Sequence, residues 1–292
     1  MSTVHSFQNH AAMTTVGVLA LQGAFYEHVQ LLQKAAAKLA ELDAATPEQS
    51  WRFIEVRTQE ELNSCDGLII PGGESTAIAL VAARSNLLDP LRDFVKIHRK
   101  PTWGTCAGLI LLAESANRTK HGGQDLIGGL DVRVNRNHFG RQTESFQELL
   151  DLPFLKNACN GNAQPLQIDP APFPGVFIRA PVVEKILPVG EKIHAEELQR
   201  DQTIVAPSRS PETQAARDLV GSAVEVMGVL PGRVAKLIAG ADVQTEGEAG
   251  DIVAVRQGNV FGTSFHPELT SDPRIHMWWL SQVKNASQNL RN

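Results

Sequence analysis

Apolar residues in the first third of the chain repeat at two alternating spacings. Residues 15–23 form a β-branched and apolar run that ends at glycine, and residues 24–42 carry apolar positions at helical spacing. The same alternation follows in three further segments: 51–57, 66–85 and 101–115. Each run typical of a strand ends near glycine or another turn residue. Repeated strand–helix units of this kind predict a parallel sheet that is covered by helices.

The second half of the chain is richer in strand patterns. They cover residues 129–137, 175–183, 223–230, 234–240 and 251–265, with a hairpin turn at Gln257, Gly258 and Asn259, and a final helix is expected from 273 to about 285. Two polar stretches, 157–174 and 195–222, are predicted to be inserted surface loops. We therefore expect a single α/β domain over residues 14–292, with a central, mostly parallel, flavodoxin-like sheet flanked by helices.

Composition narrows the class of ligand. The net charge of the 292 residues is −5 with no block of Lys and Arg, which argues against a nucleic-acid or anionic-membrane partner, and no apolar run is long enough to span a membrane. Three cysteines without paired spacing fit reduced thiols in the cytoplasm. Residues 1–13 have the character of a disordered tail and lack a signal-peptide pattern. A small ligand is expected, with no metal or cofactor.

Cys106 is the first candidate for chemistry. Gly104, Cys106 and Gly108 form a G-x-C-x-G pattern at a predicted strand-to-helix junction, the thiol counterpart of the nucleophile elbow of serine hydrolases. Such a turn is strained and needs small neighbours, and the helix N-terminus behind it favours the thiolate. The alternative is a small buried hydrophobic residue, which is the commonest role of a free cysteine. Cys65 and Cys159 lack this context.

The segment 263–269, TSFHPEL, favours the catalytic reading. Pro267 disfavours helix at His266 and is expected to keep the segment extended, so that His266 and Glu268 face the same side. A histidine can exchange a proton with a thiol, and a carboxylate on its other ring nitrogen fixes the tautomer. A His-x-Glu pair alone is more often an exposed polar pair, but it gains weight beside an elbow cysteine.

A third element is PGGES, residues 71–75, after the strand pattern GLII. Two adjacent glycines can turn a backbone N–H toward a carbonyl oxygen, and the Ala107 N–H would complete an oxyanion hole. An ordinary tight turn is the alternative. The carboxyl ends of parallel strands meet at one edge of a sheet, so the segments LQGA, PGGES and GTCAG are expected to converge there.

These blocks together resemble the triad glutamine amidotransferases, and more narrowly the glutaminase subunits of pyridoxal 5'-phosphate synthase. The resemblance rests on LALQGAFYEH, IIPGGEST, WGTCAGLILLA, VNRNHFGRQTESF, GVFIRAP and GTSFHPELT, which occur in the family's order across nearly the whole chain. It implies a class I glutamine amidotransferase domain in which Cys106 attacks glutamine, His266 is base and then acid, and Glu268 orients it.

The resemblance also implies the remaining site residues and the partner. The backbone N–H groups of Gly73 and Ala107 would hold the oxyanion. The residues around the bound L-glutamine would be Gly73, Glu74, Ser75, Arg136, Ile178 and Arg179. For Glu74 a helix cap, and for Arg136 a surface ion pair, are the alternatives. Ammonia would pass to a (βα)8-barrel synthase subunit.

Three other functions stay open at this point. A glutaminase subunit of another pathway, such as imidazole glycerol phosphate synthesis, would share the triad. A redox sensor with an elbow cysteine would leave the H-P-E and P-G-G segments unexplained. An inactive regulatory subunit would not need an intact triad.

Overall fold

A single large sheet organises the computed structural model, which describes residues 13–42, 50–118, 124–136, 145–156, 168–188, 197–200, 202–231 and 250–289. Eleven strands of the described residues form this sheet: ten run in the order β10-β5-β6-β9-β12-β13-β4-β3-β1-β2, and β11 pairs with β12 outside this path. Within the block β2-β1-β3-β4-β13 each pair of neighbouring strands is parallel, whereas β13 pairs antiparallel with β12 on its other side. This block has the strand order of flavodoxin-like folds, and the predicted fold class is confirmed.

The strands of the sheet are β1 (Thr14–Leu19), β2 (Trp51–Val56), β3 (Gly67–Ile70), β4 (Thr102–Thr105), β5 (Ala113–Asn117), β6 (Leu130–Asn135), β9 (Val182–Ile186), β10 (Thr203–Val205), β11 (Glu225–Leu230), β12 (Asp251–Gln257) and β13 (Val260–Thr263). A separate antiparallel pair is formed by β7 (Ser145–Leu150) and β8 (Phe173–Ile178).

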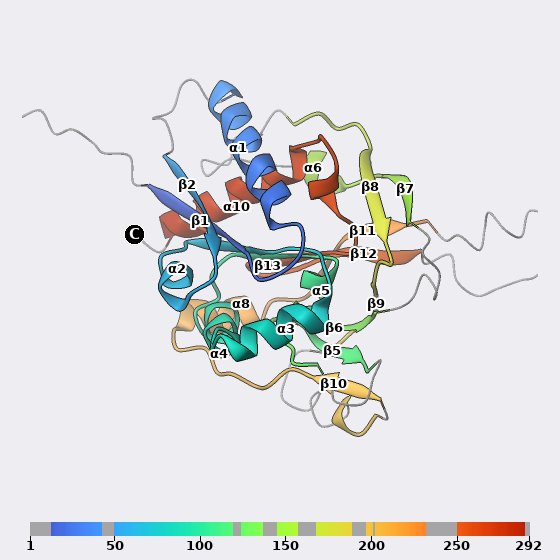
Figure 1. Ribbon diagram of the computed structural model, residues 1–292. Coiled ribbons are helices and arrows are strands. Elements are labelled where there is room, and N and C mark those ends of the chain that lie inside the picture. Colours follow the sequence, from blue (N-terminus) through green and yellow to red (C-terminus); the bar gives the residue numbers. More distant parts are fainter. Residues whose placement is uncertain are drawn as a thin grey trace, which may run out of the picture.

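Helices cover both faces of the parallel block. The helices of the described residues are α1 (Phe25–Leu42), α2 (Gln59–Asn63), α3 (Ser75–Arg84), α4 (Leu88–Arg92), the π-helix η1 (Asp93–Ile97), α5 (Ala107–Leu112), α6 (Pro153–Lys156), α8 (Gln214–Val220), the 3-10 turn η2 (Pro267–Leu269) and α10 (Arg274–Asn289). In Figure 1, α1 and α10 lie on one side of the sheet and α3 and α4 lie on the other. No helix among the described residues is long and apolar enough to cross a membrane.

Each face of the sheet has its own apolar core. Leu68 and Ile70 of β3 pack into the core under α3, α4 and α5, whereas Ile69 between them packs into the core under α1 and α10. This division follows from the two-residue period of a strand, which sends neighbouring side chains to opposite faces. A continuous apolar run such as GLII is therefore what a strand buried on both faces requires.

Two element boundaries differ from the sequence predictions. The helix expected over 107–115 ends at Leu112, because residues 113–117 form β5, which pairs with β6 and β10. The strand expected over 175–183 is divided at Arg179, whose φ of 44° turns the chain from β8 into β9. These two strands belong to different sheets, so a single straight strand could not serve both.

The second predicted surface loop, 195–222, is wrong in part, because two elements lie within it. Residues 203–205 form β10, which pairs with β5 at the end of the large sheet, and residues 214–220 form α8. In the first predicted loop, 157–174, residues 168–172 form no helix or strand, and β8 begins at Phe173, so the last two residues of the predicted loop belong to this strand. Residues 157–167, the expected strand 234–240 and the tail 1–12 lie outside the described residues.

Candidate active site

Cys106 occupies the sharp turn between β4 and α5. Its φ of 47° and ψ of −99° lie in a region that side chains rarely adopt, as in a nucleophile elbow. The turn is held by the Cys106 N–H, which donates to the Thr263 carbonyl oxygen at 2.8 Å. The small residue at Gly104 is required, because a Cβ there would lie 2.8 Å from the backbone nitrogen of Leu109. The strained turn that the G-x-C-x-G pattern predicts is present.

The neighbouring strand β13 brings His266 and Glu268 to the same edge of the sheet. Thr105 of β4 is in register with Thr263 of β13, so the chain leaves both strands side by side. The Nδ1 atom of His266 lies 2.7 Å from Oε1 of Glu268, and both side chains are buried. Since an ionised carboxylate only accepts, Nδ1 carries the proton and Nε2 is left for the thiol side.

The backbone reaches this pairing by a turn rather than by the extended segment that Pro267 led us to expect. Residues 267–269 form the 3-10 turn η2, and the His266 N–H donates to the Val176 carbonyl oxygen at 2.8 Å. Pro267 stands at the first position of this turn, where its missing N–H costs nothing. The predicted juxtaposition of His266 and Glu268 is thus present through a different conformation.

The surroundings of His266 favour its protonated form. Burial by itself lowers the imidazole pKa, but hydrogen bonds with the Cys106 and Glu268 side chains and the negative charge of both groups outweigh it and raise the pKa to about 10. An imidazolium beside a thiol stabilises the thiolate. The pair is therefore suited to nucleophilic attack followed by proton donation to a leaving group.

The PGGES segment packs directly against the imidazole. A Cβ at Gly72 would lie 2.6 Å from His266 Nδ1, so only glycine fits between the loop and the ring. Two residues after Gly72, the Glu74 N–H donates to the Gln22 side-chain oxygen at 2.8 Å. Gln22, in the turn between β1 and α1, thus fixes the loop that carries Gly73.

Glu74, Ser75 and Arg136 contact one another through the start of α3. The Glu74 carboxylate caps the helix, accepting from the backbone N–H groups of Thr76 at 3.1 Å and of Ala77 at 2.6 Å. The Arg136 guanidinium donates to the hydroxyls of Ser75 at 3.0 Å and Thr76 at 3.1 Å. The capping role that was the alternative for Glu74 is present.

Burial also acts on the two charged groups of this cluster. It raises the pKa of Glu74, but the helix N–H groups and Arg136 outweigh it and leave the pKa below its usual value. Burial lowers the pKa of Arg136, and Glu74 opposes that shift. A carboxylate and a guanidinium close together can bind the ammonium and carboxylate of a free amino acid.

Ile178 and Arg179 lie where β8 turns into β9. The Cys106 thiol contacts the Ile178 carbonyl oxygen at a sulfur–oxygen distance of 3.9 Å, and Arg179 adopts the positive φ described above. The turn therefore faces the elbow with backbone polar groups.

Sequence reasoning missed three polar residues of this region. Gln124 accepts from the hydroxyls of Ser75 and Thr76, each at 3.2 Å. His28 and His276 lie buried behind Glu268. A signal for His28 existed, because it shares the helical spacing of the buried residues Leu31, Leu32 and Ala35.

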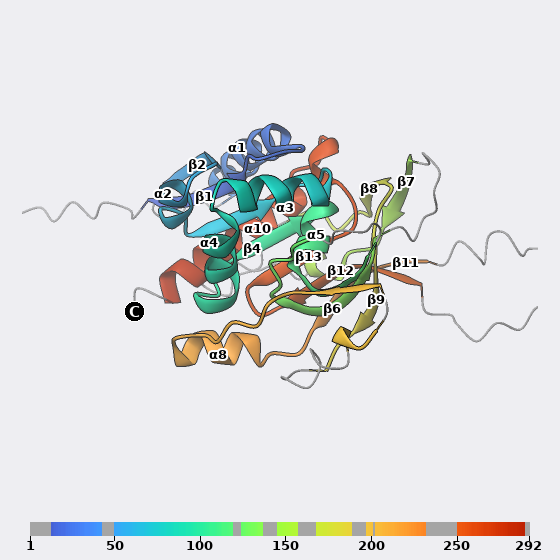
Figure 2. The same ribbon diagram turned by 60° about the horizontal axis from the view of Figure 1, so that its bottom comes forward.

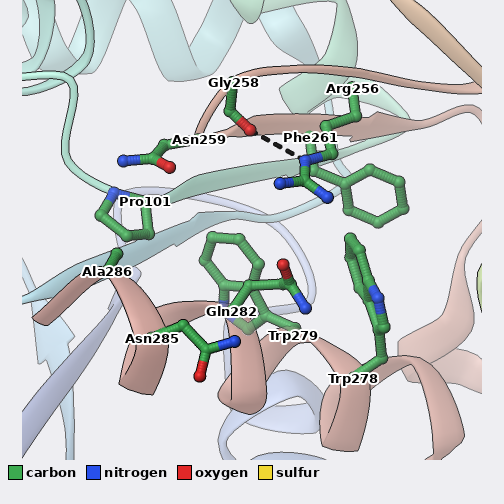
Figure 3. Close-up of a pocket in the computed structure, with 10 residues that line it drawn as sticks. All are labelled: Pro101, Arg256, Gly258, Asn259, Phe261, Trp278, Trp279, Gln282, Asn285 and Ala286. Carbon is green, nitrogen blue, oxygen red and sulfur yellow. Dashed lines mark hydrogen bonds between the residues drawn. The ribbon is translucent and has the colours of Figure 1, made fainter. Parts of the chain in front are cut away.

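A cavity of about 210 Å³ lies elsewhere and is not part of this site (Figure 3). Pro101 and Asn259, which directly precede β4 and β13, line it together with Trp278 and Gln282 of α10. It therefore opens at the amino ends of these strands, whereas Cys106 follows the carboxyl end of β4.

An elbow cysteine with a histidine–glutamate pair at the carboxyl edge of a parallel sheet defines a class of α/β proteins with a thiol nucleophile. The model of the SNO glutamine amidotransferase family matches residues 18–214 and 229–285, and the chain belongs to this family.

Curated relatives cover most of the chain. A probable pyridoxal 5'-phosphate synthase subunit PDX2 from Arabidopsis thaliana is 37% identical over 274 residues, which are 94% of this chain and 88% of the relative. The subunit SNO1 of the same synthase from Saccharomyces cerevisiae is 36% identical over 285 residues, 97% of this chain and 98% of the relative. A solved glutamine amidotransferase is 33% identical with a TM-score of 0.57, covering 92% of this chain and 98% of its own.

Proposed function

We propose that this chain is the glutaminase subunit of a pyridoxal 5'-phosphate synthase, hydrolysing L-glutamine to L-glutamate and ammonia. The observation that carries the proposal is the buried Cys106–His266–Glu268 arrangement on an elbow, in a chain of the glutamine amidotransferase family. The curated relatives named above are subunits of this synthase, which supports the vitamin B6 pathway over other amidotransferases.

In the first half of the reaction, the Cys106 thiolate attacks the side-chain amide carbon of glutamine. The oxyanion that forms is held by the N–H groups of Gly73 and Ala107. Ala107 is the first residue of α5, so its N–H has no partner within the helix and is available for this role. The His266 imidazolium then gives its proton to the amide nitrogen, which leaves as ammonia, and a glutamyl thioester remains.

In the second half, neutral His266 removes a proton from water, and the hydroxide adds to the thioester carbon. The second oxyanion collapses and expels the Cys106 thiolate, which regenerates the thiolate–imidazolium pair and releases glutamate. Glu268 keeps the His266 proton on Nδ1 in both halves, so that Nε2 faces the reacting atoms.

Glutamine itself would lie between the α3 N-terminus and the β8–β9 turn. Glu74 and Arg136 offer one charge of each sign for the amino-acid ends of the substrate, and Ser75 adds a hydroxyl. The backbone groups of Ile178 and Arg179 face the same space from the other side. These residues fit the recognition of a small zwitterion.

The partner is a synthase subunit with a (βα)8 barrel, which receives the ammonia internally. Ammonia released into water at neutral pH becomes ammonium, which is no nucleophile, so docking onto the consuming enzyme preserves its reactivity. We place the complex in the cytoplasm, in line with three cysteines that have no paired spacing.

The three alternatives lose support. A subunit feeding imidazole glycerol phosphate synthesis would share the triad, but the relatives described above carry the pyridoxal 5'-phosphate synthase name. A redox sensor would need the elbow cysteine but not a His266 that is buried against Glu268 and Gly72. An inactive regulatory subunit would have no use for the same pair.

The test is glutamate formation from glutamine by the purified chain, alone and with a synthase subunit. We expect turnover in wild type and its loss, by at least about a thousandfold, in Cys106→Ala. The matched control is Cys65→Ala, since Cys65 is also a buried free cysteine but lies outside the site. Absence of turnover in folded wild-type complex would refute the proposal.

A further inference from the structure

Two buried histidines stand behind Glu268, on the side away from His266. His28 of α1 and His276 of α10 are both fully buried. The Nε2 atom of His28 lies 3.4 Å from Oε2 of Glu268, the carboxylate oxygen that His266 does not use. The Nδ1 atom of His28 lies 3.0 Å from Nε2 of His276. The catalytic histidine, the carboxylate and two further imidazoles thus form one continuous row.

Which ring nitrogens in this row carry a proton follows from which of the facing atoms can only accept a hydrogen bond. A carboxylate oxygen only accepts, so the His28 nitrogen that faces Glu268 must carry the proton, with Thr105 Oγ1 at 3.3 Å as a second acceptor. The Nδ1 atom of neutral His28 is then an acceptor, and His276 must donate to it from Nε2.

The end of the row agrees with this assignment. His276 Nδ1 has no hydrogen-bond partner among the described residues. As a bare acceptor it costs less than a buried N–H donor left without a partner would cost. If the protons were instead on His28 Nδ1 and His276 Nδ1, the His276 N–H would have no acceptor, and the unprotonated Nε2 of His28 would face the Glu268 carboxylate.

We propose that His28, supported by His276, is a positioning residue that fixes Glu268 through its second oxygen and so keeps His266 aligned with Cys106. This inference rests on the proposed function, in which Glu268 orients His266. Glu268 Oε2 makes no hydrogen bond among the described residues, so the 3.4 Å approach of His28 Nε2 is the polar contact through which His28 would hold it.

Both imidazoles suit this role because they stay neutral. Burial lowers the pKa of His28 well below its usual value, and His276 and His266 lower it further. Burial likewise lowers the pKa of His276 to about 3, although Asp272 opposes the shift. A cation beside Glu268 would compete with the His266 imidazolium, whereas a neutral N–H holds the carboxylate without doing so.

A purely structural role for the two histidines explains less. The groups that face His28 are His276 on α10, Thr105 and the Trp103 ring on β4, and Glu268 and His266 around η2. An apolar pair of similar volume would fill this space without burying polar nitrogens. Among the described residues that face His28, Glu268 is the carboxylate that a neutral donor can serve.

The test compares His28→Leu with His28→Gln, whose amide nitrogen can replace the Nε2 donor. One readout is the pH dependence of Cys106 alkylation by iodoacetamide, followed on the Cys106 peptide by mass spectrometry. This readout needs no glutamine turnover, so it separates failure of this inference from failure of the proposed function. The second readout is kcat and KM for glutamine.

We expect His28→Leu to lower kcat roughly tenfold with little change in KM, as loss of an orienting partner does elsewhere. The acidic limb of the alkylation profile should move to higher pH by roughly one unit, because the imidazolium is less stabilised. His28→Gln should recover most of both effects. A folded His28→Leu protein with the wild-type alkylation profile would overturn the inference.

A structural role is distinguished by repeating the substitution in the Glu268→Gln background. If His28 acts through Glu268, His28→Leu leaves the alkylation profile of that variant unchanged. If His28→Leu shifts the alkylation profile equally in wild type and in Glu268→Gln, His28 does not act through Glu268. If His28→Leu does not fold, His276→Phe and His276→Gln are compared in its place, because His276 is the next side chain in the row. The inference then stands or fails on the same results as for His28.

Discussion

His266 is held between two groups that both gain from its positive charge. The Cys106 thiol lies on one side and the Glu268 carboxylate on the other, and the pKa of the imidazole rises to about 10 despite its burial. An ordinary histidine titrates near 6.5, so the folded protein binds this proton more tightly than the unfolded chain does. The site is therefore a source of pH-dependent stability.

The sign of that dependence can be predicted. A raised pKa contributes stability that is fully present below pH of about 6.5 and is lost as the pH rises toward about 10. We expect the melting temperature of wild type to exceed that of His266→Gln by a few degrees at pH 6 and to converge with it near pH 10. Thermal denaturation at several pH values measures the difference.

Two observations would check the origin of this effect. In Cys106→Ala one of the groups that raise the pKa is gone, so the convergence should move to lower pH. The His266 ring resonances should titrate near pH 10 rather than near 6.5 in wild type. A difference in melting temperature that stays constant from pH 6 to pH 10 would contradict the prediction.

For individual site residues, the sequence predicts those whose chemistry requires a particular pattern of neighbours in the chain. Cys106, His266 and Glu268 could be found because an elbow needs small neighbours and a histidine–carboxylate pair is adjacent in the chain. His276 could not, because its partner His28 is 248 positions away and only the contact of α1 with α10 brings them together. Gly72 was recognised as a turn residue, but its packing against His266 depends on the same tertiary arrangement.

The segment 195–222 shows how an apparent insertion becomes part of the sheet. Glu197 accepts from Arg133 of β6 at 2.7 Å and from Ser115 of β5 at 2.7 Å. Its side chain is only 3% exposed. Burial raises the pKa of Glu197, but Ser115 and Arg133 outweigh it and leave the pKa below its usual value. The ionised carboxylate thus anchors the start of the segment.

We expect the removal of two carboxylates that both contact Arg133 to destabilise the protein by unequal amounts. Glu197→Ala leaves a buried guanidinium without its buried partner and should lower the free energy of unfolding by about 2 kcal/mol or more. Glu184→Ala is the matched control, because Glu184 contacts the same guanidinium at 3.2 Å but is 46% exposed. Glu184→Ala should lower the free energy of unfolding by less than about 1 kcal/mol.

Urea denaturation of the three proteins at pH 7 measures these differences. At about pH 3 the gap between wild type and Glu197→Ala should narrow, since a depressed carboxyl pKa gives stability that is lost as the pH falls. Similar losses for both variants would mean that Glu197 is no more than a surface partner.

The elements that the sequence misjudged share one physical cause. No glycine or proline marks the end of α5 at Leu112, and the strand β5 that follows is fixed by pairing with β6 and β10. Polar residues in 195–222 suggested a loop, yet Glu197 and Thr203 are polar because they meet the buried Arg133. Propensity and polarity do not reveal partners that come from distant strands.

For the whole molecule, the order of the parallel strands decides where the chemistry lies. Adjacency of β3, β4 and β13 sets the carboxyl ends of three chain segments side by side, which places PGGES, Cys106 and His266 together. Alternating strand and helix patterns predicted this parallel block. Strand patterns were also present for β6 and β12 on its other side, visible in Figure 2, but no local pattern indicated that β9 lies antiparallel between them.

The site that results is nearly closed, since Cys106 is 6% exposed and His266 is 7% exposed in the isolated chain. A thiol so little exposed cannot readily admit glutamine and release ammonia unless the loops around it shift. We expect docking of the synthase subunit to cause that shift, since in the proposed function the partner receives the ammonia. Glutaminase activity should therefore depend on the partner.

We expect addition of the synthase subunit to raise the rate of glutamate formation roughly tenfold or more, within the range of ordinary coupling energies. Glutamate is measured at a fixed concentration of this chain while the synthase subunit is titrated to saturation. Cys106→Ala serves as control, since it should bind the partner without turnover. Equal rates with and without bound synthase would show that the isolated chain already holds its active arrangement, and the nearly closed site would then have to open without help from the partner.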